Sequence, residues 1–268
     1  MMKTTPGVLY EEHGAVARIT LDREDSLNAL TFGMYRGLTD TFLELAGRDA
    51  VRAVVITGRG RAFCTGGDVR EIIGPLLEMD RAQLLEFTRL TCDLIAAMRA
   101  LPKPIVASLN GPVAGAGAVL ALASDIRVAA EGARIAFLFV KVGLAGADMG
   151  AAWLLPRIVG LGRATELLMT GDFVDAAEAL RIGLYNRVVP PERLDEETRA
   201  WADKLARGPA PGLAATKQAL EAEAFMPLPQ ALAHEAEVQA RLMLGWDFRE
   251  GHRAFVEKRP PRFTGAPE

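Results

Sequence analysis

The sequence predicts an α/β fold with a helical C-terminal region, and three observations support this. Short apolar runs suited to buried strands occur at residues 51–57 and 105–109. Each run is followed by a glycine turn and then by a segment with helical spacing of apolar residues. After residue 190 the pattern is helical throughout. Strands that alternate with helices indicate layered α/β packing.

The first elements follow from apolar periodicity. Residues 15–21 alternate apolar and polar side chains, which predicts a strand. A polar loop at 22–28 follows, and apolar residues at helical spacing predict a helix at 31–46. The continuous apolar run at 51–57 predicts a buried strand.

The middle of the chain begins with a helix at 80–100, because its apolar side chains form one face and Pro102 and Pro104 end it. A buried strand is predicted at 105–109, and a small-residue helix is predicted after the next turn, up to Ser124. Further strands are expected at 125–130, 134–138 and 186–189, and further helices at 162–169 and 175–180.

The C-terminal helices are expected at 192–206, 212–224, 228–244 and 248–258. The run Gly208-Pro209-Ala210-Pro211-Gly212 interrupts this pattern and is the best candidate boundary. We therefore expect a core at 1–207 that carries the functional site, and a helical region at 208–268.

Composition excludes several function classes. Half of the 268 residues are hydrophobic, which is enough for a large core, and the formal net charge of −3 argues against a nucleic-acid binder. Two cysteines without a disulfide pattern, and an N-terminus without an apolar signal region, indicate a cytoplasmic protein. The uncharged stretch 104–124 is interrupted by Asn110-Gly111-Pro112, so we predict no membrane span.

Two glycine turns that follow buried strands are the strongest functional signal. One contains Gly66-Gly67 and the other Gly115-Ala116-Gly117, at the start of a predicted helix. Backbone N–H groups at such positions are unpaired and lie at the positive end of the helix dipole. Two converging donors would stabilise the oxyanion of a thioester enolate. The alternative is that both are ordinary structural turns.

These turns carry a family resemblance. The run Ala62-Phe63-Cys64-Thr65-Gly66-Gly67-Asp68, followed by Lys103-Pro104-Ile105-Val106-Ala107 and Asn110-Gly111-Pro112, resembles the enoyl-CoA hydratase/isomerase (crotonase) superfamily. Matches continue in order from about Val16 to Arg259, including Leu155-Pro156-Arg157 and the closing run from Glu250.

The resemblance implies a crotonase-like spiral of ββα units that acts on an acyl-CoA thioester. Gly67 and Ala116 match the two oxyanion-hole positions, although many members have glycine where this chain has Ala116. A backbone donor survives that change if the residue has a negative φ. The resemblance also implies fatty acid metabolism, no permanently bound cofactor, and C-terminal helices that assemble trimers or hexamers.

Contacts with coenzyme A, which is part of the substrate, are also implied. Leu27 and Ala29 match the loop that contacts the adenine through backbone groups. Phe255 and Lys258 match the C-terminal helix that reaches CoA, sometimes on a neighbouring subunit. We assign Gly66, Asp68 and Val69, which flank Gly67, to the same binding site.

The acid/base residues depart from the family. Counting along the chain puts Val119 and Phe139 where the hydratases have two glutamates, and neither can move a proton. Asp148 lies where some isomerases of the superfamily have a catalytic aspartate. One carboxylate can move a proton between two carbons, which is double-bond isomerisation. The alternative role for Asp148 is a cap of the helix that begins near Met149.

Other reactions stay open. The runner-up is hydration of an enoyl-CoA by non-standard groups, and decarboxylation or ring-altering reactions use the same oxyanion hole. A rival from another class is an acyl-CoA binding protein that has lost catalysis, which the apolar pair Val119 and Phe139 would suit.

The remaining candidates are interpreted as structural. Asp68 is expected to act as a turn or cap residue, Asp125 to begin a strand, and Cys64 to be a small buried side chain. Phe137, Phe139 and Trp153 either shape an acyl pocket or pack in the core. The three histidines, His13, His234 and His252, lack metal-ligand spacing, so no metal is predicted.

Overall fold

The computed structural model describes residues 5–265, and within them the fold is built on a six-stranded sheet with the order β1-β2-β3-β4-β6-β8. The β1 strand is antiparallel to β2, and the other neighbours are parallel. The strands are β1 (Val8–His13), β2 (Val16–Leu21), β3 (Ala53–Gly58), β4 (Ile105–Leu109), β6 (Ile126–Ala130) and β8 (Arg187–Val189). A second sheet pairs β5 (Val113–Ala114) with β7 (Ile135–Ala136).

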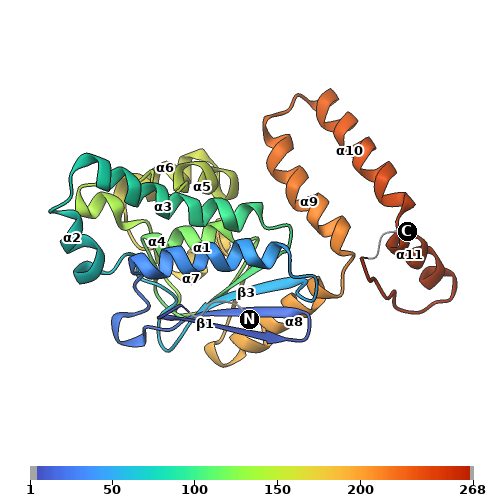
Figure 1. Cartoon of the computed structure of the whole chain (residues 1–268), viewed down its shortest axis with the longest axis horizontal. Helices are drawn as coiled ribbons and strands as arrows, with labels where there is room; N and C mark the ends of the chain where they lie inside the picture. The colour runs from blue at the N-terminus through green and yellow to red at the C-terminus, as the bar shows by residue number, and fades with distance from the viewer. Residues whose placement is uncertain (1–4, 266–268) are drawn as a thin grey trace.

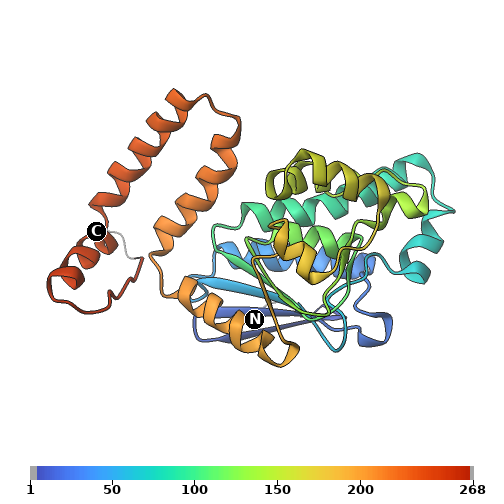
Figure 2. The ribbon, with the colours of Figure 1, turned by 180° about the vertical axis from the view of Figure 1, so that it is seen from behind.

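The helices form two groups. Those of the core are α1 (Phe32–Ala46), α2 (Gly74–Leu76), α3 (Arg81–Ala100), α4 (Ala116–Ala123), α5 (Ala151–Val159), α6 (Leu161–Thr170), α7 (Ala176–Arg181) and α8 (Leu194–Ala206). The others are α9 (Ala210–Ala222), α10 (Leu228–Leu244) and α11 (Trp246–Val256), which extend away from the core as an arm (Figures 1 and 2).

Both faces of the sheet are covered, as the fold class predicts. Helices α1, α3 and α4 lie over one face and α8 over the other (Figure 1). The larger apolar cluster fills the first interface, and a smaller one joins Val55 and Val106 to Leu194 and Ala202 of α8. Burial on both faces explains why β3 and β4 read as continuous apolar runs rather than alternating ones.

Most predicted elements are present, with ends that shift by one to three residues. The strand at 105–109 and the helix at 228–244 have the predicted bounds. The strand β1 was missed because its sequence is polar toward its end and it lies at the edge of the sheet. The strand predicted at 134–138 is shorter, Ile135–Ala136, because a 3₁₀ turn begins at Leu138.

The arm starts at Gly208, where the sequence places its boundary. Arg52, which precedes β3, donates hydrogen bonds to the carbonyl oxygens of Gly208 (2.6 Å) and Phe263 (2.7 Å). The core thus holds both the first residue of the arm and the segment after α11. That residues 1–207 form a separate domain stays a prediction.

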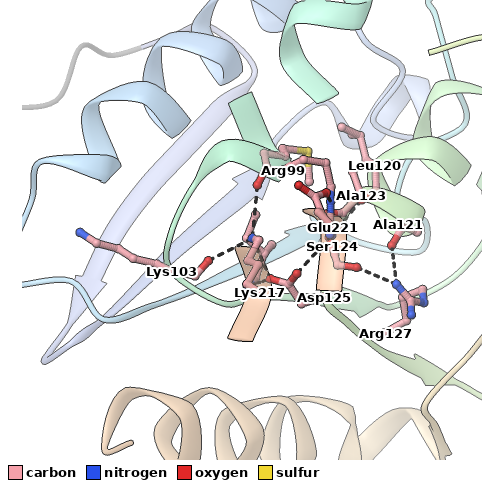
Figure 3. A network of polar contacts seen from close by, with 12 residues as sticks. Arg99, Lys103, Leu120, Ala121, Ala123, Ser124, Asp125, Arg127, Lys217 and Glu221 are labelled. Carbon is pink, nitrogen blue, oxygen red and sulfur yellow. Dashed lines mark hydrogen bonds and ion pairs between the residues drawn. The ribbon is translucent and has the colours of Figure 1, made fainter. Parts of the chain in front are cut away.

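A buried ion-pair network docks α9 on the core (Figure 3). The Nζ atom of Lys217 on α9 lies 2.9 Å from Asp125, and the Lys217 side chain is only 8% exposed. Asp125 also accepts the N–H of Ile105 at the start of β4 and pairs with Arg99, which contacts Glu221 of α9. The structural role predicted for Asp125 is confirmed. Burial lowers the pKa of Lys217, and the nearby carboxylate opposes this effect.

Replacing Lys217 with methionine is expected to lower the free energy of unfolding by about 3 kcal/mol, because it leaves a partly buried carboxylate short of one partner. This loss of stability is at the low end for buried ion pairs because Asp125 retains its ion pair with Arg99 and its hydrogen bond from the Ile105 N–H. Urea unfolding would measure the change. Lys141→Met, in an exposed pair with Asp172, is the control and should cost under about 1 kcal/mol. Equal costs for the two variants would contradict the docking role of Lys217.

Candidate active site

The two glycine turns meet in space. A Cβ on Gly117 would lie 2.3 Å from the carbonyl oxygen of Cys64, so only glycine allows this approach. The Cys64 carbonyl accepts the N–H of Ala114 at 2.9 Å, which fastens one turn to the other. Gly66 and Gly115 have φ of +105° and +52°, in the region that favours glycine.

The backbone donors of Gly67 and Ala116 are available. Leu30 forms backbone hydrogen bonds with the residues on either side of Gly67: its N–H donates to the Gly66 carbonyl, and its carbonyl accepts the Asp68 N–H. The Gly67 N–H therefore points away from this bridge between Leu30 and Gly67. Ala116 is the first residue of α4. Within residues 5–265, neither N–H donates to a backbone carbonyl. Ala116 is not among the residues with positive φ, so the condition for a backbone donor at this position is met.

The turns that carry the two donors lie close together. The Ala116 nitrogen is 3.6 Å from the position that a Cβ on Gly66 would occupy, and that position is open enough for ordinary contact. Two unpaired N–H groups in touching turns, one of them at a helix start, can bind an oxyanion. A thioester carbonyl that takes on enolate charge is such an anion.

Asp148 lies half-buried in the loop before α5. Its Oδ1 atom accepts the N–H of Met149 at 2.8 Å, and within the described residues no other group bonds the carboxylate. Met149 and Gly150 both have positive φ, +50° and +85°. The residue that caps α5 is Gly150, and it makes no side-chain cap. The alternative that the Asp148 side chain caps this helix is therefore wrong.

The electrostatic surroundings of Asp148 favour its protonated form. Burial raises the pKa of Asp148, and the Met149 N–H opposes this with a smaller effect. The sequence alone could not decide which of these two effects on the Asp148 pKa is larger, and in the structure the effect of burial is larger. The Asp148 charge also helps burial to raise the pKa of Cys92 on α3 and of Tyr35 on α1. Cys64 is fully buried, as predicted, and burial raises the pKa of its thiol to about 12.

Asp148→Asn is expected to increase thermodynamic stability at neutral pH. Because the pKa of Asp148 is raised in the folded state, folding favours the protonated carboxyl. This contribution to the free energy of unfolding is present at low pH and is lost as pH rises through the folded-state pKa, so the ionised carboxylate is unfavourable at pH 7. The Asn side-chain oxygen can still accept the Met149 N–H. Denaturant unfolding at pH 7 and at pH near 4 would measure the gain, which should shrink at the lower pH. A variant that is less stable at pH 7 would contradict the cost of ionisation.

The positions of the usual glutamates are apolar and enclosed. Val119 on α4 is fully buried and Phe139 is 9% exposed, and both belong to the main core cluster. Phe137 also packs there, so core packing is confirmed for both phenylalanines. Trp153 is partly exposed and packs against Phe225, in the 3₁₀ turn that follows α9.

A cavity of about 970 Å³ opens beside the Gly67 turn. Of the residues predicted to bind CoA, it is lined by Ala29, Asp68 and Val69. Asp68 caps the π-helix Val69–Ile73 by accepting two backbone N–H groups, so its predicted cap role is confirmed. These N–H groups and Arg23, 2.9 Å away, lower the pKa of Asp68.

The sequence analysis missed the basic side chains of this cavity. Arg23, Arg59 and Arg70 contribute to its wall. They come from three separate segments of the chain, so no local pattern in the sequence reveals them. The same wall also carries five carboxylates, and two of the arginines are paired with them: Arg23 with Asp68 and Glu71, and Arg59 with Asp22.

Asn28 is a second residue that sequence reasoning missed. It is fully buried, with φ of +59°, and its amide donates to the carbonyl oxygens of Arg59 and Ala62. These bonds hold the predicted adenine loop against the turn that leads to Gly67. Leu27 shares the left-handed conformation, at φ +52°. The sequence offered one indication of this role, an asparagine within a loop, because asparagine tolerates the left-handed conformation better than most residues.

Two of the predicted CoA residues lie elsewhere in this chain. Phe255 is on α11, which lies in the arm at the opposite end of the molecule from α2 (Figure 1). Its side chain is 84% exposed. Lys258 follows the same helix. A single chain therefore does not bring them to the cavity.

Within residues 5–265, no group of three or more potential metal ligands is found. Among the same residues, no helix is both long and apolar enough to cross a membrane.

Comparisons with known proteins agree with this geometry. The sequence profile of the enoyl-CoA hydratase/isomerase family matches residues 11–266. A crystal structure of a "putative enoyl-CoA hydratase" from Streptomyces coelicolor A3(2) is 54% identical, with a TM-score of 0.94 over 97% of this chain and 94% of that one.

Two curated relatives carry different names. A "Probable enoyl-CoA hydratase" from Rhodobacter capsulatus is 42% identical over 96% of this chain and 98% of its own. The 1,2-epoxyphenylacetyl-CoA isomerase of Escherichia coli K12 is 34% identical, with the same shares. The family match, the similarity to these relatives and the shared fold show that this chain belongs to the enoyl-CoA hydratase/isomerase (crotonase) family of enzymes that act on acyl-CoA thioesters.

Proposed function

We propose that this enzyme moves a double bond within an acyl-CoA thioester, with Asp148 as the acid and base. The observation that carries the proposal is a half-buried carboxylate whose pKa is raised, in a chain that has paired N–H donors in its glycine turns and the apolar residues Val119 and Phe139 at the usual glutamate positions. A raised pKa brings a carboxylate closer to the value at which it can both take and return a proton.

The reaction needs no added atoms. The Asp148 carboxylate removes a proton from one carbon of the enoyl chain, and the electron pair moves through the chain into the thioester carbonyl. The Gly67 and Ala116 N–H groups stabilise the resulting oxyanion. The carboxyl then returns the proton to another carbon of the conjugated system, the carbonyl re-forms, and the double bond has shifted. No activated water takes part.

CoA is proposed to lie along the 970 Å³ cavity. The Leu27–Ala29 loop contacts the adenine, and Gly66, Asp68 and Val69 flank the thioester end. This orientation brings the thioester to Gly67, which also lines the cavity.

Phe255 and Lys258 are proposed to reach the CoA of a neighbouring chain in a homotrimer or hexamer. The arm supports this because it exposes many apolar side chains, which association would bury. These are Leu220, Phe225, Leu228, Leu232, Met243, Leu244, Phe248, Phe255 and Val256.

The test is an assay in deuterated water with 2-enoyl, 3-enoyl and 2,5-dienoyl thioesters. Mass spectrometry reads deuterium uptake and added water, and absorbance reads the shift of the double bond. A shifted bond with deuterium and no added water supports the isomerase. Added water means hydration by other groups, which the hydratase names of several relatives suggest. Binding without any exchange supports the acyl-CoA binding protein.

A further inference from the structure

Tyr35 on α1 has a hydroxyl group that the mechanism above does not use. The residue is only 2% exposed. Within residues 5–265 its hydroxyl makes no hydrogen bond, and the hydroxyl oxygen is not completely enclosed by other atoms. The hydroxyl is therefore without a partner among the described residues. A buried hydroxyl without a partner is unfavourable, so a function that retains it is expected.

The orientation of the Tyr35 ring is fixed by its neighbours. The ring packs edge-on against Phe87 of α3, with centroids 6.0 Å apart and planes at 85°. Phe87 in turn packs edge-on against Phe32 at 5.3 Å. Three interlocked rings hold the hydroxyl in one direction, because such aromatic packing is geometrically specific. The hydroxyl is thus a preorganised group and not a mobile one.

Tyr35 lies in the neighbourhood of Cys64 and Asp148. Burial raises its pKa, and the nearby Cys64 and Asp148 add to this effect. Cys64 lies directly under the oxyanion turn, where its Cβ would be 2.7 Å from a Cβ on Gly117. The raised pKa favours the protonated phenol, which can donate a hydrogen bond in the neighbourhood of the Cys64 turn and of Asp148.

We propose that Tyr35 is a specificity-determining residue whose hydroxyl donates a hydrogen bond to an oxygen on the acyl chain of the substrate. The substrate class is then an oxygen-bearing acyl-CoA and not a plain hydrocarbon one. This inference rests on the proposed function in one respect, namely that the acyl chain lies beside Asp148. A site that contains a buried donor disfavours an analogue without the matching acceptor, because the donor then stays unpaired.

The test measures binding without turnover. Hexanoyl-CoA and its 3-, 4-, 5- and 6-hydroxy derivatives, which are saturated and contain no double bond to move, are titrated by calorimetry into the wild type and Tyr35→Phe. The wild type should bind at least one hydroxy derivative about tenfold more tightly than hexanoyl-CoA. Tyr35→Phe should lose this preference and bind hexanoyl-CoA as well as the wild type does, or better.

The controls separate this inference from the proposed reaction. Tyr10→Phe removes a hydroxyl that bonds Glu12 in β1, far from α3, and should keep the preference. Equal binding of all five thioesters by the wild type, or a preference that survives in Tyr35→Phe, would overturn the inference. Neither outcome affects the isomerase proposal, which depends on deuterium exchange. Conversely, exchange that survives in Asp148→Asn rejects the isomerase proposal and leaves the binding preference intact.

Discussion

Asp148→Asn is expected to lower the rate of deuterium exchange into the acyl chain by about 10²- to 10⁴-fold, the usual contribution of a general acid or base. Asparagine keeps the hydrogen bond from the Met149 N–H but cannot take a proton. Because the change leaves the cavity beside Gly67 untouched, the affinity for CoA thioesters should change little. Exchange rates by mass spectrometry and affinities by calorimetry would separate the two effects.

The matched control for this variant is Asp93→Asn, an exposed carboxylate on α3 next to Cys92. It removes the same charge from the same neighbourhood and should retain the wild-type rate. A rate that also falls in Asp93→Asn would mean that charge near α3, and not proton transfer by Asp148, limits the reaction. An unchanged rate in Asp148→Asn would assign the proton transfer to another group.

Ala116→Pro is expected to lower the rate by at least about 100- to 1,000-fold, which is the typical effect of losing one oxyanion donor. Proline has no N–H, so it deletes the donor itself. Ala116 is the first residue of α4, a position where helices accept proline because that N–H has no partner within the helix. The fold should therefore survive, and the loss should appear in kcat, since the oxyanion forms only during the reaction.

The control for the proline variant is Ala116→Gly, which keeps the N–H and restores the residue that many family members carry. It should remain within a few-fold of the wild type, by steady-state kinetics, with unfolding curves recorded for both variants. If glycine and proline lower the rate equally, the methyl group and not the N–H is the important feature at this position.

The candidate site was predictable where its chemistry belongs to the backbone. The two glycine turns were found from the sequence because a buried strand, a glycine turn and a helix start are local patterns, and the family resemblance then identified Gly67 and Ala116 as the donors within them. Glycine at 117 is required by contact with Cys64, but the pattern of small residues already signals a close approach. The apolar character of Val119 and Phe139 was also evident from the sequence.

Side-chain surroundings could not be predicted in the same way. The raised pKa of Asp148 depends on its burial beside α3, and its rejection as a helix cap depends on the left-handed Met149 and Gly150. The unpaired hydroxyl of Tyr35 gives no signal in the sequence, because its periodicity on α1 is that of any core residue.

The sequence by itself determined the layers of the fold, the position of both glycine turns and the absence of a carboxylate pair at the usual positions. The first two depend on local patterns of apolar and glycine residues, which determine secondary structure directly, and the third depends on counting along the chain from the residues that carry the family resemblance. Only the tertiary structure decided that the two turns touch, that three arginines share one cavity and that Phe255 lies far from it in the same chain. These facts arise from contacts between segments far apart in the chain, and burial and pKa follow from such contacts.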